Sequence, residues 1–527
     1  MKEKIFYGNE ILTMENCSKK PLAVKITNGI ITKLYYNKSY ENEICEKINL
    51  KNNCLMPSFI DSHSHIVQFA DSLRFINLST CKDFKDICKK IKDFIKDNNI
   101  SENQWVVGFA YDNNFLEEKK HPNAKILDEI SENHPILITH TSGHMGVLNT
   151  SGLKLNNISS STSNPDGGYI EKDENGNPTG YLEEKAFMNI SKNIPQADEA
   201  TMEKLLLKAQ KIYLSYGITT AQEGIMTQRE FNILKKASKN NNLICDIVGY
   251  ADMKKAPMLL EENISYYKKY INHLKIGGYK IFLDGSPQGR TAWMKKSYKD
   301  DKNYFGYPIY KDKEVENFVS ICYKNNIQLL CHCNGDAAIE QYLSALLKEK
   351  NQNDIRPVII HSQFMEKSQL DKVKEVSAIP SYFIAHTYFW GDIHIKNFGK
   401  ERADFISPLK STLNKNILFT LHQDTPVILP DMLFTVWCAA SRITKNNVPL
   451  CQDETITPYH ALKALTINGA YQYFEENTKG SIKEGKMADF IILSENPLKC
   501  STNKIKNIKI LQTIKNGETV YEYKENQ

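Results

Sequence analysis

The 527-residue sequence lacks the features that mark several common classes of protein. No apolar run approaches the roughly 20 residues that a helix needs to cross a bilayer. There is no Gly-x-Ser-x-Gly motif of a serine hydrolase and no phosphate-binding P-loop. The net charge is only +5, from 67 basic and 62 acidic residues. Lysine pairs such as Lys19-Lys20 are short, so the charge pattern argues against nucleic acid as a partner.

The sequence also lacks regularly paired cysteines. Its 12 cysteines are scattered, and the close pair Cys331 and Cys333 has no second pair to complete a zinc knuckle. Free thiols are typical of a reducing compartment, and the opening Met-Lys-Glu-Lys is not a secretory signal. We therefore expect a cytoplasmic protein.

The apolar content of 41% is ordinary for a globular protein, and the length allows a barrel-sized domain plus another. Short strands separated by turns are expected near both ends of the chain. Neither end has enough strands to cover a core by itself. We therefore predict one small composite β-sandwich domain formed by residues 1–55 and 470–527.

Between these ends, over residues 56–469, predicted strands alternate with predicted helices, which is typical of parallel βαβ units. About eight such units close into a TIM-like (β/α)8 barrel, and an open doubly wound sheet is the alternative. Residues 105–108 would then form an extra strand. The polar segment 149–193 is predicted to be an insertion that acts as a lid over the barrel. The strand candidates are residues 55–60, 105–108, 136–140, 219–222, 277–283, 327–333, 358–361, 379–385 and 417–422.

The most informative stretch runs from Met56 to His65 and ends in Asp61, His63 and His65. Residues i and i+2 of an extended strand point to the same side, so both imidazoles can reach one object. Two imidazoles on the same side of a strand are best suited to bind a metal ion. The alternative is a strand end that carries two surface histidines.

Four further polar residues lie in or just after predicted strands: Lys280, His332, His361 and Asp424. Each alone has an ordinary explanation, such as a hydrogen-bonded core histidine or a lysine that extends to water. Together with His63 and His65 they form an ordered set, each on its own strand. A barrel gathers its strand ends on one face, so the set predicts a single site.

Several longer motifs accompany this set. They are the Leu148–Leu153 run after Gly143-His144, Gly167–Ile170, Thr179–Leu182 with Glu184, Asp284–Ser286 with Arg290–Ala292, Asn334–Ala338 and Gly480–Asp489. With these motifs the sequence resembles the amidohydrolase superfamily, and within it the amidohydrolase family 3 branch that includes N-substituted formamide deformylases. The resemblance covers nearly the whole chain and implies a metal-dependent barrel hydrolase with a composite β-sandwich.

The resemblance also implies a ligand set, made of His63, His65, His332, His361 and Asp424, with Lys280 as the lysine of the fourth strand. Lys280 would bind as it stands or as a carbamate that bridges two metal ions. Lys275, five residues earlier, is the rival lysine. Zinc suits a His/Asp site with open positions best, although iron or manganese could fit.

The implied mechanism is attack of metal-bound hydroxide on a carbonyl carbon, because a divalent ion lowers the pKa of bound water to about 7. Asp424, Lys280 and His144 are the predicted catalytic residues: Asp424 passes the proton to the leaving nitrogen, and His144 donates to the oxyanion. Arg290 would hold an anionic group. The run from His386 to His394 is predicted to line the pocket, with His386 and Trp390 as substrate contacts. For His144 and Arg290 the alternative is a loop residue bonded to backbone.

We therefore expect a metal-dependent hydrolase that acts on a non-peptide carbon–nitrogen bond of a small amide, N-acyl or N-formyl compound. A cyclic amidase or deaminase of the same superfamily is the alternative. A scaffold that kept the barrel and lost the metal is a third interpretation. The predicted partner is the small-molecule amide alone, with neither nucleic acid nor membrane, and a homodimer is compatible with this type of barrel.

Overall fold

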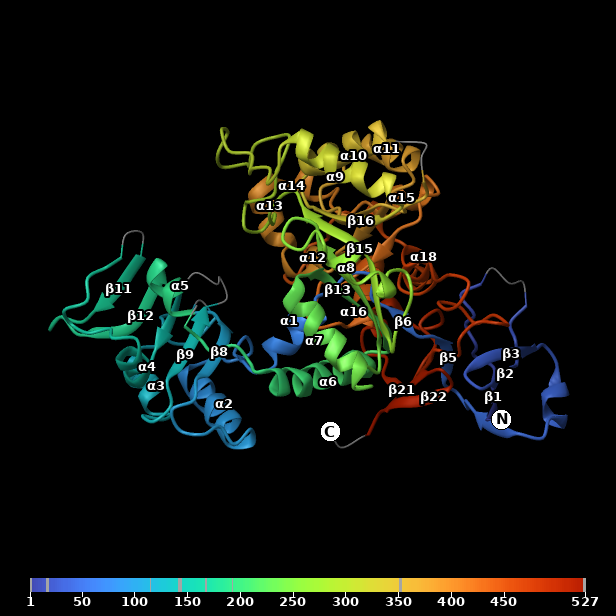
Figure 1. The fold of residues 1–527 in the computed structure, drawn as a ribbon, viewed down its shortest axis with the longest axis horizontal. Helices are drawn as coiled ribbons and strands as arrows, with labels where there is room; N and C mark the ends of the chain where they lie inside the picture. Colours follow the sequence, from blue (N-terminus) through green and yellow to red (C-terminus); the bar gives the residue numbers. More distant parts are fainter. Residues whose placement is uncertain are drawn as a thin grey trace. The chain divides into compact units, whose positions relative to one another are not determined.

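The computed structural model describes residues 2–15, 19–113, 115–140, 145–165, 168–191, 193–349 and 353–524. The chain forms two compact units (Figure 1). The larger unit contains residues 1–69 and 206–527, and the smaller unit contains residues 70–205. Across the described ranges, no helix combines the length and the apolarity needed to cross a membrane.

An eight-stranded parallel sheet forms the centre of the larger unit. Its strands pair in chain order, as expected for a TIM-like fold and not for a doubly wound sheet. At the ends of the sheet, Ser62 Oγ donates to Leu421 O and His65 N donates to Thr425 O, both at 2.8 Å. The TIM-like class is therefore confirmed. The strands are β6 (Phe59–Ile60), β13 (Ile218–Met226), β14 (Asp246–Asp252), β15 (Leu274–Phe282), β16 (Gln328–Cys333), β17 (Val358–His361), β18 (Ile379–Tyr382) and β19 (Thr420–Leu421).

Amphipathic helices cover this sheet. In α10 (Asp336–Lys348) the buried residues Ile339, Tyr342, Leu343 and Leu346 recur at helical spacing, so one stripe faces the sheet. Figure 1 shows α9 (Asp312–Lys324) and α10 together beside β15 and β16. Other helices of this unit are α1 (Ile66–Ser72), α7 (Gln228–Lys239), α8 (Leu259–Glu262), α11 (Gln369–Glu375), α12 (His386–Phe389), α13 (Gly391–Phe398), α14 (Lys400–Ala403), α15 (Leu409–Asn414), α16 (Met432–Ser441), α17 (Pro458–Ala464), α18 (Ile467–Gln472) and α19 (Thr502–Ile505). The chain crosses between the two units twice, within α1 after Phe69 and within α6 (Glu199–Ser215) after Leu205.

Two four-stranded sheets combine both ends of the chain. One pairs β3 (Ile30–Tyr35), β2 (Ala23–Thr27), β1 (Glu3–Tyr7) and β4 (Glu46–Asn49); the other pairs β22 (Glu518–Glu522), β21 (Ile510–Lys515), β20 (Phe490–Leu493) and β5 (Cys54–Pro57). They share an apolar core in which the Phe6 and Phe490 rings lie 5.9 Å apart. Both sheets belong to the larger compact unit, so a separate domain with boundaries at residues 55 and 470 stays a prediction.

The smaller unit contains a six-stranded sheet in the order β11 (Gly168–Lys172), β12 (Pro178–Glu184), β10 (Met145–Leu148), β9 (Ile136–His140), β8 (Val106–Tyr111) and β7 (Ile76–Asn77). Its helices are α2 (Phe84–Asp97), α3 (Ala124–Asp128), α4 (Thr150–Leu155) and α5 (Lys185–Ser191). Segment 149–193 supplies β11 and β12, and β12 pairs with β10. The segment is thus built into this sheet, and its role as a lid stays a prediction.

Residues 105–108, predicted to be an extra strand, overlap β8 of the smaller unit and lie outside the eight-stranded sheet, so this prediction is confirmed. The assignment of residues 136–140 to the barrel was wrong, because they form β9 of the smaller unit. Strand β14, which was not predicted from the sequence, is the remaining member of the eight-stranded sheet, between β13 and β15. Its ends are acidic, at Asp246 and Asp252, and it contains Gly249, so it lacks the apolar run of its neighbours even though all seven of its residues are buried.

Candidate metal centre

The candidate site lies where the parallel strands end. His63 follows β6 by three residues, and Asp424 follows β19 by three. Lys280, His332 and His361 lie in the C-terminal parts of β15, β16 and β17. Because the carboxyl ends of parallel strands meet at one edge, residues more than 300 positions apart in the chain become neighbours.

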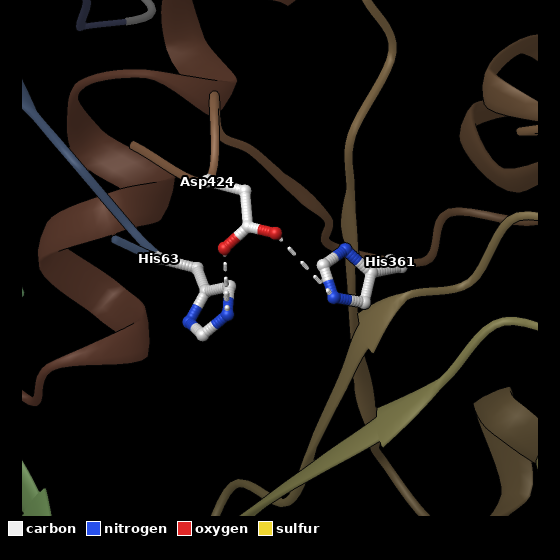
Figure 2. Close-up of side chains that lie close together, drawn as sticks. All are labelled: His63, His361 and Asp424. Atoms are coloured by element: carbon white, nitrogen blue, oxygen red, sulfur yellow. Dashed lines mark ion pairs between the residues drawn. The ribbon is translucent and has the colours of Figure 1, made fainter. Parts of the chain in front are cut away.

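Three of these side chains converge most closely: His63, His361 and Asp424 (Figure 2). One ligand atom of each lies within 4.8 Å of those of the other two. Asp424 Oδ1 is 3.3 Å from His63 Nε2, and Asp424 Oδ2 is 3.9 Å from His361 Nε2. Two imidazoles and one carboxylate at these separations can surround a single cation.

The chemistry of the donors fits a metal ion. Asp424 Oδ1 is buried and accepts no hydrogen bond within the described part of the chain. Leaving a buried carboxylate oxygen unsatisfied costs about 1–3 kcal/mol or more, so such atoms are rare. His63 Nε2 and His65 Nε2 lie 3.3 and 3.5 Å from this oxygen. A divalent cation among these atoms would satisfy the carboxylate and the imidazole lone pairs together.

The other predicted ligands lie around this centre. His332 Nδ1 is 3.1 Å from His361 Nε2, and Lys280 Nζ is 3.4 Å from His63 Nε2. The structure therefore brings all six predicted residues together, and which of them bind metal stays a prediction. The rival Lys275 lies at the other end of β15, where it pairs with buried Glu475 and donates to Tyr473 O. It is thus excluded from the site.

Two residues of β13 support the histidines, and the sequence did not single them out. Gln222 Oε1 lies 2.6 Å from His63 Nδ1, so the proton on Nδ1 leaves the Nε2 lone pair free toward Asp424. Glu223 Oε1 lies 3.7 Å from His65 Nδ1. Their sequence signal is only an amide followed by a carboxylate inside a buried strand.

His422 lies beside His361 and not at the centre. Its Nε2 is 3.3 Å from His361 Nδ1, and its Nδ1 is 3.0 Å from Ser381 Oγ. Burial lowers the pKa of His422 to about 3, so its ring is neutral at neutral pH.

Burial and the charges of the site act against each other. It holds the pKa values of His63 and His361 well below the ordinary value, which keeps both rings neutral and able to bind a cation. It also lowers the pKa of Lys280 to about 8, against the opposing effect of Asp424. Burial works against ionisation of Asp424, but the nearby imidazoles hold its pKa well below the ordinary range.

Of the predicted substrate contacts, Arg290 lies in the segment after β15, His386 begins α12 and Trp390 follows that helix. His144 falls outside the described residues. Arg290 follows β15, and its guanidinium lies over the Tyr298 and Tyr304 rings at 5.3 and 5.8 Å, with no ion pair to any described residue. The His386 ring packs 4.5 Å from Trp390 and 4.7 Å from Phe383. The Phe383 ring lies 5.4 Å from His422.

A TIM-like sheet that gathers imidazoles and a carboxylate at its strand ends has the architecture of a hydrolase. The chain belongs to the amidohydrolase family, whose model matches residues 46–521. Its resemblance to that family is thereby confirmed, and it is a hydrolase that acts on carbon–nitrogen bonds.

Relatives and solved structures match almost end to end. The chain is 26% identical to the putative amidohydrolase YtcJ of Bacillus subtilis, over 98% of this chain and 99% of the relative. It is 25% identical to the N-substituted formamide deformylase of Arthrobacter pascens, over 90% of each. An uncharacterized metal-dependent hydrolase from Pyrococcus horikoshii has the same fold, with a TM-score of 0.77 and 23% identity over 95% of this chain and 99% of that one.

Proposed function

We propose that the protein is a metal-dependent hydrolase of a non-peptide carbon–nitrogen bond in a small amide, N-acyl or N-formyl compound. The observation that carries the proposal is the buried Asp424 carboxylate, which lies among imidazole nitrogens and has an oxygen that accepts no hydrogen bond within the described chain. The printed name of the Arthrobacter relative, a formamide deformylase, supports this bond type.

In this proposal His63, His361 and Asp424 hold a divalent ion, with His65, His332 and Lys280 as further ligands. Zinc suits these donors best. When bound, such an ion lowers the pKa of a coordinated water to about 7 and polarises a carbonyl group. Closure of the eight-stranded sheet into a barrel between β6 and β19 would keep all six residues on one face. The hydrogen bonds from Ser62 and His65 to the chain at and after β19 support that closure.

The side chains of the protein have distinct tasks. Asp424 takes a proton from the attacking water and delivers it to the leaving nitrogen, because its carboxylate stays ionised beside the imidazoles. Gln222 and Glu223 fix the orientations of His63 and His65. Arg290 would bind an anionic group of the substrate, and Trp390 would pack against its apolar part.

The test is a substrate screen with the full-length protein after loading with zinc, manganese or iron. Hydrolysis of N-formyl and N-acetyl amides is followed by release of the amine and the acid, and hydrolysis of cyclic amides by formation of the ring-opened amino acid. We expect turnover of at least one class, and a loss of about 100-fold or more in kcat for Asp424→Asn with the metal retained.

Metal content measured on the same samples completes the test. Full activity of a metal-containing Asp424→Asn variant would remove Asp424 from the proton transfer. Absence of tightly held divalent metal, with no effect of His63→Ala on stability, would instead support a scaffold without catalysis.

A further inference from the structure

Two buried histidines near the proposed centre contact each other in the segment after β18. His386 Nδ1 lies 3.1 Å from His394 Nε2, and the two rings are nearly parallel at 7°. Both side chains are buried, with exposed fractions of 5% and 0%. A single N–H···N hydrogen bond joins the rings, so one histidine donates and the other accepts.

The surroundings of His394 decide which ring donates. Its other nitrogen, Nδ1, is buried and has no hydrogen-bond partner in the described chain. The rings of Phe364 and Phe398 lie 5.8 and 6.2 Å from the imidazole and offer no acceptor. A buried N–H without an acceptor is rarer in proteins than an unused acceptor. His394 therefore carries its proton on Nε2 and donates it to His386 Nδ1.

The proton of His386 follows from this assignment. Burial lowers the pKa of His394 to about 3 and holds that of His386 well below the ordinary value, so both rings are neutral. With Nδ1 accepting, the single proton of His386 is on Nε2, which faces away from His394 on the ring. Among the described residues, no side chain or carbonyl accepts from Nε2.

The position of His386 relates this N–H to the candidate centre. The Phe383 ring lies 4.7 Å from the His386 ring and 6.3 Å from the His361 ring, so one aromatic side chain neighbours both His386 and a proposed ligand. The charge of Asp424 also acts on His386. An N–H donor at this place suits the carbonyl oxygen of a substrate, where negative charge develops during attack.

We propose that His394 is a positioning residue that fixes the tautomer of His386 and so presents His386 Nε2–H to the carbonyl oxygen of the substrate. The role of His386 rests on the proposed hydrolase function, whereas the tautomer assignment does not.

Three variants of His394 distinguish the effect of the N–H donor from the effect of the side-chain shape. His394→Gln keeps an N–H donor near the position of Nε2, His394→Met keeps the bulk without a donor, and His394→Glu offers only an acceptor. For a substrate found in the screen, we expect kcat to fall about 10- to 100-fold in His394→Met, because the hydrogen bond to the oxyanion is lost. The fall should be smaller in His394→Gln, which keeps that hydrogen bond. Lys396→Met, on the exposed side of the same helix, is the control and should leave kcat unchanged.

A double-mutant cycle tests whether His394 acts through His386. In a His386→Phe background, His394→Met should cause no further loss of kcat, because the donor is already absent. An equal loss in both backgrounds would overturn the positioning role and assign the effect of His394 to packing.

Nitrogen-15 NMR of histidine-labelled protein provides a measurement that does not depend on activity. The His386 signals, assigned by their loss in His386→Phe, should show the Nε2–H tautomer in the wild type and the Nδ1–H tautomer in His394→Glu. An Nδ1–H tautomer in the wild type would overturn the proposal. This result stands even if the screen finds no substrate, so failure of the proposed function and failure of this inference are distinguishable.

Discussion

Lys280 is the residue of the centre whose charge is least compensated. It is fully buried, forms no ion pair within the described ranges, and lies 3.4 Å from an imidazole nitrogen. Burial lowers its pKa to about 8, so a fraction of the amine is neutral near neutral pH. A neutral amine can form an N–C bond with carbon dioxide and release a proton. The resulting carbamate would supply two oxygens to a metal site.

Replacement of Lys280 by alanine tests this role. We expect Lys280→Ala to lose metal and activity, and added acetate or propionate to restore part of both, because a small carboxylate can occupy the space of the carbamate. Acetamide and propionamide, which have the same shape but no charge, are the controls and should restore nothing. Equal rescue by the amides, or no rescue by the acids, would contradict a carbamate and leave Lys280 as a simple amine.

The strand-end histidines and acids could be picked out from the sequence because they stand out against apolar runs. Gln222 and Glu223 did not stand out, since an amide and a carboxylate have no diagnostic spacing and their partners are about 160 positions away. The tautomers of His386 and His394 could not be predicted either. They depend on which ring nitrogen lies among aromatic side chains, which only the packed structure defines.

At the scale of elements, the end of β13 is what orients the His-x-His pair. Consecutive strand residues normally point to opposite faces, yet Gln222 approaches His63 and Glu223 approaches His65. The pairing of β13 with β14 shifts register between Glu223 and Met226, and Glu223 forms an isolated bridge with His65. An irregular strand end of this kind can aim two neighbouring side chains at one site.

Gln222→Met tests this support. Loss of the acceptor for His63 Nδ1–H should lower metal affinity by about 10- to 100-fold, the usual effect of removing such a partner. Chelator competition on the folded protein measures it. Gln210→Met is the matched control, because Gln210 is equally buried but bonds only backbone groups of Asn242, Ile244 and Cys245.

Both glutamine variants should lose stability. Gln210→Met leaves buried backbone groups without a partner, and Gln222→Met removes the hydrogen bonds to His63, Ser62 O and the Tyr473 hydroxyl. Only Gln222→Met should lose metal affinity. An equal change of affinity in the two variants would assign the effect to general destabilisation and remove Gln222 from the support of the centre.

The sequence could not decide which sheet each strand joins. Residues 136–140 have the apolar composition of a barrel strand, yet they join the sheet of the smaller unit. Strand β14 joins the eight-stranded sheet despite its acidic ends. Pairing depends on contacts between distant segments, whereas local composition reports only that a segment is extended and buried.

At the scale of the whole larger unit, a buried cluster of charges ties the C-terminal strands to the parallel sheet. Asp246, the first residue of β14, lies 2.6 Å from Lys479 Nζ and 2.8 Å from Lys515 Nζ, and 2.7 Å from His273 Nδ1. Lys515 belongs to β21, so this one carboxylate joins two sheets. The acidic start of β14, which hid the strand from sequence analysis, is thus explained by its partners more than 200 residues later.

Asp246→Asn should therefore destabilise the protein by about 1.5–3 kcal/mol at pH 7, because it removes one charged partner from each of two buried ammonium groups. Lys479 keeps Glu475 at 3.0 Å, and Lys515 keeps Asp489 at 3.6 Å. Burial opposes ionisation of Asp246, but Lys479 and Lys515 hold its pKa well below the ordinary value. The unfolded chain consequently binds a proton at a higher pH than the folded one. This stabilisation is complete above the unfolded pKa, near 4, and is lost as the pH falls toward the folded pKa.

Thermal unfolding followed from pH 7 to pH 3 should show a steep acid loss of stability in the wild type and a shallower one in Asp246→Asn. Glu340→Gln is the control: Glu340 pairs with Lys372 and Lys295 near the surface, so its loss should cost about 1 kcal/mol or less. Parallel pH profiles for the wild type and Asp246→Asn would show that the pKa of Asp246 is the same in the folded and unfolded states. The buried cluster would then not be the contact that holds the two sheets together.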